Sequence, residues 1–404
     1  MQIADFIRER APLTVAAFME LALYEPELGY YARASRRSGR AGDFFTSVDV
    51  GPLFGELLEI QLAEMGRLTA EAAEHAAPSG LSAPSARSAV RPFDLVEAGA
   101  GNGRLSSDIL RAAKRRDPAF YESVRLHLVD ASAEARRAHA ETLGDVADRL
   151  VSSASRLPES FEGVLVANEL LDALPVHQIV MRANGLREVY VDSATRGSAA
   201  GTPGSDPGVR PGAQTSLILR EGPLSTPELA AYLERLGVTL EPGWRVEVNL
   251  RAVDWIRDAA RRLTRGFIIL IDYGHQARDL YSASHSAGTL TTFARHRSEG
   301  PESSAESPAW LQQPGDQDLT AHVDFTSVRA AAEAEGLTTI ALLDQTYFLL
   351  GLVGAMDLDD LKARLALKTL IMPGGLGSTH KVLILGKGVG APRLRGGSFS
   401  VRIT

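Results

Sequence analysis

The chain has 404 residues, and 45% of them are hydrophobic, so it can bury the core of one large domain or two modest ones. It contains no cysteine, which excludes disulfides, thiolate metal sites and cysteine nucleophiles. Its formal net charge of −7 argues against general nucleic-acid binding, although it is compatible with a basic peptide substrate.

The sequence indicates neither a membrane span nor a targeting segment. Its longest clean apolar run, residues 267–271, is far too short to cross a bilayer. Residues 1–12 carry Asp5 and Glu9 among basic residues and lack an apolar signal core, so neither export nor organelle import is indicated. We therefore predict a cytoplasmic protein with no membrane span.

The N-terminal region is expected to contain two helices and a loop suited to a ligand. Apolar spacing over residues 14–24 suits a short helix capped by Thr14. Residues 24–31 and 38–47 then place aromatic, acidic and hydroxyl side chains beside glycines, as in ligand-binding loops, but ordinary turns anchored by aromatic side chains have the same composition. Residues 51–65 have the apolar stripe of an amphipathic helix.

A strand, a glycine turn and a helix are expected in succession between residues 93 and 116. The apolar run 93–96 ends in an acid and three alternating glycines, Glu97, Gly99, Gly101 and Gly103. Alternate glycines let the backbone pass close beneath a ligand, while the first helical turn points its free amides at it. A dinucleotide fingerprint would need its third glycine at position 104, which is an arginine, so an NAD(P)-dependent oxidoreductase is the less favoured alternative.

The spacing acid-x-Gly-x-Gly-x-Gly resembles motif I of the class I S-adenosylmethionine (SAM) methyltransferases. In those proteins the loop lies beneath the methionine and ribose parts of the cofactor, and no pyrophosphate has to be held. The resemblance implies SAM as the cofactor, with Glu97, Gly99, Gly101 and Gly103 in its binding site.

A second strand, residues 125–130, ends in an acid, and a helix is expected over 131–143. In a fold of this kind, an acid at the tip of the second strand can accept both ribose hydroxyls. Asp130 is placed for that contact, although aspartate also favours the N-cap of a helix and both roles can hold at once. Residues 149–153 are expected to form a short third strand.

The next strand, residues 163–167, leads into three polar side chains, Asn168, Glu169 and Asp172. Ligands of open α/β sheets bind beyond the carboxyl ends of the strands, so these side chains are expected in or near that crevice. Glu169 and Asp172 fall on one side of a helical turn, and two carboxylates there could bind a planar guanidinium. In the alternative, Asn168 caps a turn that Pro175 ends, and both acids lie in solvent.

Segments rich in Ala, Gly, Ser and Pro interrupt this pattern. They are expected to be surface insertions or flexible loops, and they cover residues 74–92, 191–213 and 282–316. Residues 176–190 and 214–220 have the pattern of strands in an inserted element around the second of them, and the apolar-faced segment 247–263 ends in a helix.

The last strands are expected to complete the sheet. Residues 266–274 form a fully buried strand that brings Asp272 and Tyr273 to the functional rim, where Tyr273 is as much a packing candidate as a substrate contact. Further strands are expected at 338–350 and 381–386, and the second of these is expected to close the sheet with an antiparallel hairpin.

Asp318 and His322 are close enough in sequence for a metal site or a proton relay to be considered. A lone histidine without a second nitrogen or sulfur ligand nearby is usually structural. We therefore predict no metal site.

Several blocks together resemble the MidA family of class I SAM-dependent methyltransferases, which includes the protein arginine methyltransferase that assists assembly of mitochondrial complex I. The N-terminal blocks are Glu25-Pro26-x-x-Gly29-Tyr30-Tyr31, Gly42-Asp43-Phe44-Phe45-Thr46-Ser47, Phe54-Gly55-Glu56-Leu57 and Glu97-x-Gly99-x-Gly101-x-Gly103. The later blocks are Ala167-Asn168-Glu169-x-x-Asp172-Ala173-Leu174-Pro175-Val176-His177-Gln178, Ile271-Asp272-Tyr273-Gly274 and Asp318-Leu319-Thr320-Ala321-His322-Val323-Asp324-Phe325. The block that begins at Ala167 is far more specific than the glycine turn.

The resemblance implies an α/β fold, a Rossmann-like doubly wound sheet of the class I methyltransferase type, with an N-terminal helical extension and an inserted subdomain. Residues 1–70 would form a helical cap with a loop that closes over SAM. Residues 93–404 would form the methyltransferase core, with insertions near 191–213 and 282–316.

The resemblance also implies roles for single residues. Gly99, Gly101 and Gly103 would lie beneath SAM, Asp130 would bind its ribose, and Asn168 would also contact it. Thr46 and Ser47 would close over the methionine end. Glu169 and Asp172 would be catalytic: they would orient an arginine side chain and suit the proton that leaves after transfer.

The chain departs from the family pattern at three positions. The family often has Pro and Arg where this chain has Ala100 and Asn102, and it usually has Glu where this chain has Asp130, whose shorter side chain reaches less far.

The implied partner is a protein substrate, with a subunit of a respiratory complex as one candidate and a homodimer as an open alternative. An assembly factor that binds SAM without catalysis is the second functional alternative. The sequence does not identify the methylated atom.

Overall fold

The computed structural model describes residues 3–32, 45–76, 91–195, 215–294, 297–300, 308–356, 360–372 and 375–399. The chain divides into two compact units. The first comprises Met1–Arg33, Ala173–Arg251 and Arg278–Ala321; the second comprises Ala34–Asp172, Ala252–Ala277 and His322–Thr404. These boundaries differ from the expected cap at 1–70, because helix α3 (Leu53–His75) packs into the core of the second unit.

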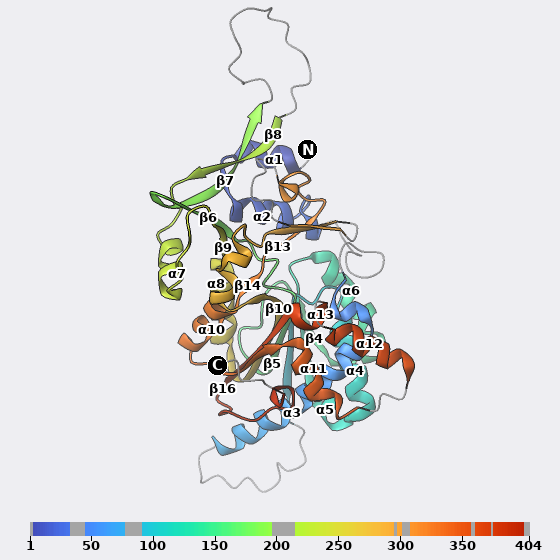
Figure 1. Cartoon of the computed structure of the whole chain (residues 1–404). Coiled ribbons are helices and arrows are strands. Elements are labelled where there is room, and N and C mark those ends of the chain that lie inside the picture. The colour runs from blue at the N-terminus through green and yellow to red at the C-terminus, as the bar shows by residue number, and fades with distance from the viewer. Residues whose placement is uncertain are drawn as a thin grey trace, which may run out of the picture. The chain divides into compact units, whose positions relative to one another are not determined.

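The second unit is built on an eight-stranded sheet with the order β15-β16-β10-β5-β2-β3-β4, and β14 pairs with the end of β10 (Figure 1). The strands are β2 (Phe93–Ala98), β3 (Val124–Val129), β4 (Leu150–Ala154), β5 (Phe161–Asn168), β10 (Leu263–His275), β14 (Val323–Asp324), β15 (Thr338–Asp344) and β16 (His380–Lys387). Strands β4, β3, β2, β5 and β10 are parallel, whereas β16 runs antiparallel to both of its neighbours, β10 and β15. This order confirms the predicted doubly wound fold and its closing antiparallel pair.

Helices cover both faces of this sheet. They are α3, α4 (Arg104–Arg116), α5 (Pro118–Ser123), α6 (Ala133–Leu143), α8 (Leu250–Arg262), α10 (Phe325–Ala334), α11 (Gln345–Val353), α12 (Leu361–Ile371) and α13 (Leu376–Thr379), with short 3-10 turns η2 (Ser47–Val50), η4 (Gly144–Arg149) and η7 (Arg395–Gly397). The short helix α9 (Ala277–Leu280) falls at the boundary with the first unit. Leu57 and Phe348 pack in one core with Val164 of the sheet, and Leu165 on the opposite face is also fully buried. Figure 1 shows α4, α11 and α12 to the right of β10, β5 and β16, and α8 and α10 to their left. Burial on two faces explains the near-continuous apolar runs of the central strands.

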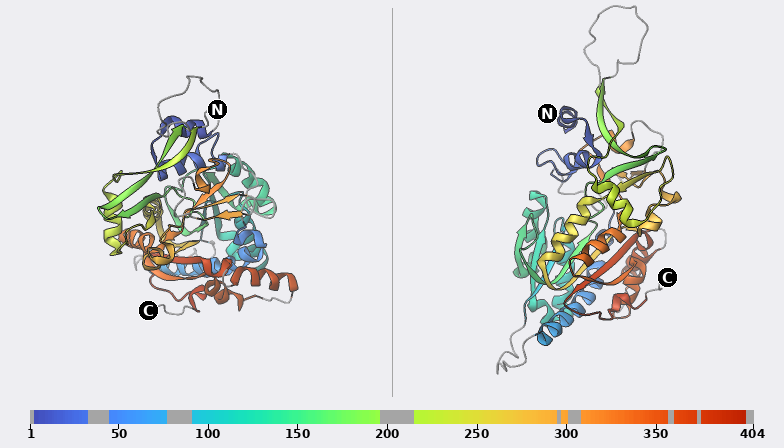
Figure 2. Two further views of the ribbon diagram at one scale, coloured as in Figure 1. Left: turned by 45° about the horizontal axis from the view of Figure 1, so that its top comes forward. Right: turned by 90° about the vertical axis from the view of Figure 1, so that its left-hand side faces the viewer.

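The first unit holds the inserted strands and the first two helices, and Figure 2 shows its long β7–β8 ribbon from two further sides. Its strands β1, β7, β6 and β9 pair antiparallel in that order, β8 extends β7, and a second sheet has the order β12-β11-β13. The strands are β1 (Leu13–Thr14), β6 (His177–Arg182), β7 (Gly185–Thr195), β8 (Thr215–Gly222), β9 (Arg245–Val248), β11 (Thr291–Ala294), β12 (Arg297–Glu299) and β13 (Asp318–Thr320). The helices are α1 (Ile3–Arg10), α2 (Val15–Tyr24) and α7 (Glu228–Leu236), with 3-10 turns η1 (Tyr30–Ala32), η5 (Ala283–His285) and η6 (Ala309–Leu311). The Thr14 hydroxyl accepts a hydrogen bond from the Ala17 amide (3.1 Å), which confirms the predicted N-cap of α2.

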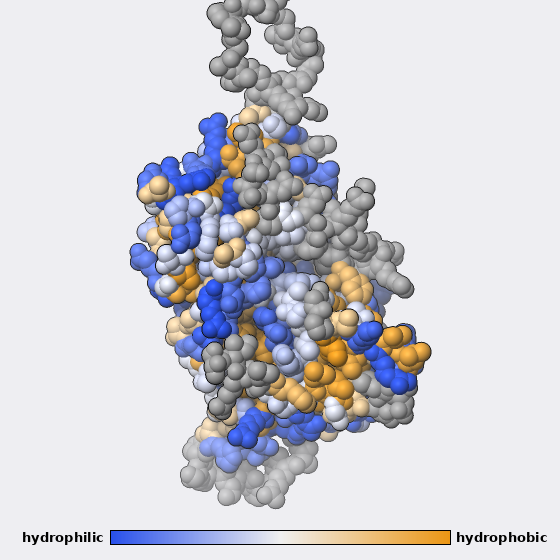
Figure 3. Space-filling model, in the orientation of Figure 1, coloured by the Kyte–Doolittle hydropathy of each residue, from blue (hydrophilic) through white to orange (hydrophobic). Residues whose placement is uncertain are grey.

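The helices α10 to α13 at the C-terminal end of the second unit were not expected from the sequence. The strand predicted over 338–350 is wrong beyond Asp344, where α11 begins, because a short buried apolar run has the same pattern in a helix as in a strand. Helix α12 also carries apolar side chains on its outer face, where Leu361 is 64% exposed and Leu365 is 56% exposed. Its sequence therefore lacks the single apolar stripe that predicts an amphipathic helix. Figure 3 shows hydrophobic residues gathered where α11 and α12 lie in Figure 1.

Parts of the three predicted insertions, and residues 38–44 of the expected ligand loop, lie outside the described residues. The described part of 282–316 contains η5, β11 and η6, and is therefore not all loop. Within the described residues, no helix is both long enough and apolar enough to cross a membrane.

Candidate functional site

The turn between β2 and α4 needs glycine at each of its three alternating positions. The φ angles are +71° at Gly99, +53° at Gly101 and +86° at Gly103, all in the left-handed region. A Cβ atom on Gly99 would lie 3.1 Å from Leu170, and one on Gly103 would lie 3.1 Å from Leu128. A Cβ atom on Gly101 would have no described atom within 4 Å. Gly101 is thus the glycine of this turn that borders open space.

Asp130, which directly follows β3, is hydrogen-bonded to this glycine turn. Its Oδ2 accepts a hydrogen bond from the Gly101 amide (2.8 Å), and its Oδ1 accepts one from the Ser132 amide (2.8 Å). The N-cap of α6 is Ser132, whose hydroxyl accepts from Ala135, so the N-cap alternative for Asp130 is wrong. Burial raises the pKa of Asp130. Each carboxylate oxygen keeps a further lone pair, so both could still accept a ribose hydroxyl.

His139 supports the same turn from α6, and the sequence analysis did not identify it. Its Nε2 lies 2.9 Å from the Gly101 carbonyl oxygen, and its Nδ1 lies 2.8 Å from the Ser153 hydroxyl. Burial lowers the pKa of His139, which favours the neutral ring.

Glu97 faces the first turn of α4. Its Oε2 accepts hydrogen bonds from the Ser106 amide (3.2 Å) and the Ser106 hydroxyl. Burial raises the pKa of Glu97 to about 7. In this structure Glu97 is hydrogen-bonded to the helix that follows the glycine turn. Its contact with the cofactor stays a prediction.

Thr46 and Ser47 lie in a segment that is held against the start of α4. The Thr46 amide and hydroxyl both donate to Asp49 Oδ2 (3.0 Å each), and Asp49 Oδ1 lies 3.2 Å from an Arg104 nitrogen. The Ser47 hydroxyl is buried and donates to Gln345 Oε1 (3.1 Å). Asp49 and Gln345, which no sequence pattern marked, therefore position this segment.

The acidic turn after β5 has an uncommon backbone. Glu169 has φ = +51°, the one positive φ of a non-glycine residue among the described residues. Its amide donates to the Ile271 carbonyl (2.8 Å), and the amides of Leu170 and Leu171 donate to Asp272 Oδ2 (3.1 and 2.7 Å). Burial, with a contribution from the Glu169 charge, raises the pKa of Asp272 to about 7. Such backbone strain persists where neighbouring groups enforce it, and Asp272 does so here.

The side chains of this turn are sheltered from solvent. Asp172 is 5% exposed and the Glu169 side chain is 12% exposed, so the alternative with both acids in solvent is wrong. Glu169 Oε1 accepts a hydrogen bond from Asn168 Nδ2 (3.2 Å). Burial, together with the charges of Glu169, Asp172 and Asp272, raises the pKa of Tyr273.

A buried histidine from β16 completes this cluster, and it too was missing from the sequence analysis. His380 Nε2 lies 3.5 Å from Glu169 Oε1, and the His380 ring lies 3.9 Å from the Tyr273 ring. In the antiparallel pair Tyr273 is opposite His380, so the first residue of β16 lies where the parallel strands end. The available signal was a histidine two residues before the apolar run 382–385.

The glycine turn and the acidic turn meet at one edge of the sheet. Ala98, the last residue of β2, pairs with Ala167 of β5, and Asn168 pairs with Ile271 of β10. A Cβ atom on Gly99 would lie only 3.1 Å from the Leu170 side chain, so the two turns are close neighbours. The structure thus brings the predicted glycines, Asp130 and the acidic turn together beyond the carboxyl ends of neighbouring strands.

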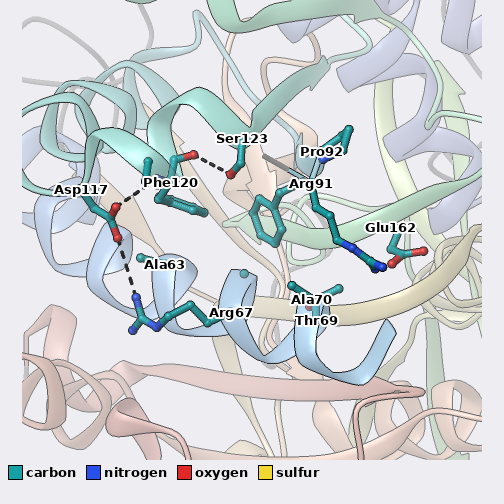
Figure 4. Close-up of a pocket in the computed structure, with 13 residues that line it drawn as sticks. Ala63, Arg67, Thr69, Ala70, Arg91, Pro92, Asp117, Phe120, Ser123 and Glu162 are labelled. Carbon is teal, nitrogen blue, oxygen red and sulfur yellow. Dashed lines mark hydrogen bonds and ion pairs between the residues drawn. The ribbon is translucent and has the colours of Figure 1, made fainter. Parts of the chain in front are cut away.

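A pocket of about 300 Å³ lies at the opposite edge of the same sheet, between α3, α5 and the first residues of β2 and β5 (Figure 4). Phe93 and Phe120 line it, and Arg67 pairs with Asp117 at its rim (3.8 Å). Phe93 opens β2, so this pocket is on the side away from the glycine turn and belongs to a different part of the surface.

Comparisons with known proteins agree with this geometry. A crystal structure of a COG1565 superfamily member from Burkholderia thailandensis, bound to S-adenosyl-homocysteine, is similar with a TM-score of 0.78 and 27% identity over 98% of this chain and 94% of that one. A protein arginine methyltransferase NDUFAF7 homolog of Drosophila melanogaster is 28% identical over 97% of this chain and 86% of its own length. The NDUFAF7 protein of Mus musculus is 28% identical over 85% of this chain and 71% of its own.

These two relatives are named as mitochondrial proteins, which contradicts the predicted cytoplasmic location. The prediction depended on the composition of residues 1–12, and the composition of so short a segment does not determine location. A family model described as "Putative S-adenosyl-L-methionine-dependent methyltransferase" matches residues 81–343, which is most of the chain and includes the glycine turn, Asp130 and the acidic turn. The chain therefore belongs to this family of SAM-dependent methyltransferases.

Proposed function

We propose that this chain transfers the methyl group of SAM to an arginine side chain of a protein. The observation that carries the proposal is the pair of sheltered carboxylates, Glu169 and Asp172, on a strained turn close to the glycine turn. Relatives named as protein arginine methyltransferases support it. A subunit of a respiratory complex is the first candidate substrate from the family resemblance, and the homodimer stays a prediction.

The residues at this edge fit SAM. Gly101 borders open space at a left-handed φ, as a backbone beneath a ligand requires, and Asp130 is beside it. Asn168 Oδ1 is buried without a hydrogen-bond partner among the described residues, so it can accept one from a ligand. Gly99 to Gly103, Asp130 and Asn168 would hold SAM, with Thr46 and Ser47 predicted at its methionine end. Bound SAM supplies a methyl group that its sulfonium activates.

The acidic turn would then bind the acceptor. A guanidinium is planar and always charged, and two carboxylates can orient it through charge-assisted hydrogen bonds. The shelter of Glu169 and Asp172 strengthens these bonds because little water competes for them. Alignment of the nitrogen with the methyl carbon lowers the barrier chiefly by orientation. Glu169 is also placed to accept the proton that leaves the nitrogen.

The proposal is tested with radiolabelled SAM and a heat-treated cell extract whose own methyltransferases are inactive. We expect the purified protein to label proteins in the extract, and mass spectrometry to locate the label on arginine. Label on lysine or carboxylate side chains would contradict the arginine assignment. Absence of transfer, with SAM binding confirmed by calorimetry, would favour the assembly factor without catalysis.

Gly101→Asn is expected to weaken SAM binding without unfolding the protein. Asparagine tolerates a left-handed φ, but its side chain would enter the space above the turn. We expect SAM affinity to fall about 30-fold, which corresponds to roughly 2 kcal/mol. The matched control is Gly237→Asn, because Gly237 also has a left-handed φ (+62°) and no described atom near its Cβ position, but caps α7 in the other unit. Equal dissociation constants for both variants in calorimetry would remove Gly101 from the SAM site.

A further inference from the structure

His380 is held in one orientation by its surroundings. Its side chain is fully buried, and its Nδ1 lies 2.9 Å from the Leu376 carbonyl oxygen. A carbonyl oxygen only accepts hydrogen bonds, so Nδ1 must carry a hydrogen. The Nε2 atom then faces Glu169 Oε1 at 3.5 Å, and it has no hydrogen-bond partner among the described residues.

In this arrangement His380 Nε2 and Glu169 Oε1 face each other without a hydrogen bond. In the neutral ring, the Nε2 lone pair points toward a carboxylate oxygen, and 3.5 Å is too long for a good hydrogen bond. A buried polar atom without a partner is costly. A proton on Nε2 would allow a charge-assisted hydrogen bond between the imidazolium and the carboxylate.

Charged and titratable groups surround His380. Asp272 and Tyr273 face it from β10, and Asp172 lies near Tyr273 on the acidic turn. The neighbouring cation on β16, Lys381, is bound to Asp344 and to the Ser378 carbonyl. The nearby acids therefore outnumber the positive charges that would oppose an imidazolium.

We propose that His380 is a positioning residue that orients Glu169 and takes from it the proton released by methyl transfer. This inference depends on the proposed arginine methylation. The new N–C bond uses the nitrogen lone pair, the electron pair of the broken C–S bond stays on sulfur, and the guanidinium loses one proton. That proton passes to Glu169 Oε1 and then to His380 Nε2, and it returns to solvent through Glu169 after the product leaves.

The contact between His380 and Glu169 is tested without measuring activity, by nitrogen NMR of protein with labelled histidines. We expect the His380 signal to show a hydrogen on Nδ1, and the Nε2 signal to shift in Glu169→Gln, because the carboxylate that faces Nε2 becomes an amide. An identical Nε2 signal in parent and variant would overturn the proposal. This result does not require arginine to be the substrate, so it separates failure of the pair from failure of the proposed function.

The transfer of the proton from Glu169 to His380 is tested with two substitutions of His380. Asparagine in His380→Asn can keep the hydrogen bond to Leu376 but is too short to reach Glu169, whereas glutamine in His380→Gln can donate to Glu169 but cannot take up a proton. We expect kcat to fall about 100-fold in His380→Asn, with less loss in His380→Gln. The kcat of His380→Gln should rise with pH over a range in which the parent is flat, because solvent must then accept the proton.

The matched control is His177→Gln, which removes another histidine–carboxylate contact (His177 Nδ1 to Glu188 Oε1, 2.7 Å) in the first unit and should leave kcat unchanged. Calorimetry with SAM checks that the variants are folded. An unchanged kcat in His380→Asn, or parent behaviour of His380→Gln at every pH, would overturn the proton transfer.

Discussion

Glu169→Gln is expected to bind SAM as the parent does and to lose methyl transfer about a thousandfold. Glutamine has nearly the same shape, so the Asn168 contact and the left-handed backbone at 169 can persist. Under the proposed function, the substitution removes the charge that would orient the guanidinium and the base that would accept its proton. A general base typically contributes about 10²–10⁴-fold to the rate, and the loss expected here lies within that range. The measurements are calorimetry with SAM and single-turnover transfer of labelled methyl groups.

Glu162→Gln is the control for this substitution, because Glu162 is at the amino-terminal end of β5 and its side chain is 44% exposed. It should transfer methyl groups at the parent rate. Equal transfer rates in Glu169→Gln and the parent would remove Glu169 from the reaction, and loss of SAM affinity would place it in the cofactor site instead.

Gly266→Ala is expected to destabilise the second unit strongly. Gly266 of β10 is opposite Gly163 of β5 in the middle of the parallel sheet, and its φ is +126°, which side chains rarely allow. An added Cβ atom would lie 1.9 Å from the Gly163 carbonyl oxygen, so the two central strands would have to separate. We expect the free energy of unfolding to fall by at least about 4 kcal/mol, measured by urea unfolding.

Gly354→Ala is the matched glycine control. Gly354 follows α11 with φ = −62° and has no described atom within 4 Å of its Cβ position. It should be neutral or slightly stabilising, because alanine reduces the freedom of the unfolded chain. A melting temperature of Gly266→Ala within about 3 °C of the parent would contradict the close approach of β5 and β10.

The backbone of the site could largely be predicted from short stretches of sequence. The alternating glycines predicted a turn that requires left-handed φ angles, and Gly99, Gly101 and Gly103 all have them. The apolar runs predicted the strands, and Asp130 and Glu169 directly follow two of them. Parallel strands that end together bring such residues to one edge, so the location of the site followed from the order of the elements.

The side-chain contacts of the site could not be predicted in this way. Ser47 bonds to Gln345, Asp49 pairs with Arg104, and His380 faces Glu169, and in each pair the two residues are far apart in the sequence. The left-handed φ of Glu169 has no sequence signal either, because a glutamate gains nothing from it locally; the Asp272 carboxylate and the Ile271 carbonyl hold it in place.

The sequence by itself therefore determined the class of fold, the glycine turn and the acids that follow the strands, because each depends on the conformation or apolar pattern of adjacent residues. Only the tertiary structure decided that α3 joins the core of the second unit, that residues 345–353 are helix, and that a histidine lies behind the acidic turn. The place of the histidine depends on the register and reversed direction of β16, and the other two features depend on the packing of apolar side chains that are distant in the sequence. Neither leaves a local pattern in the chain.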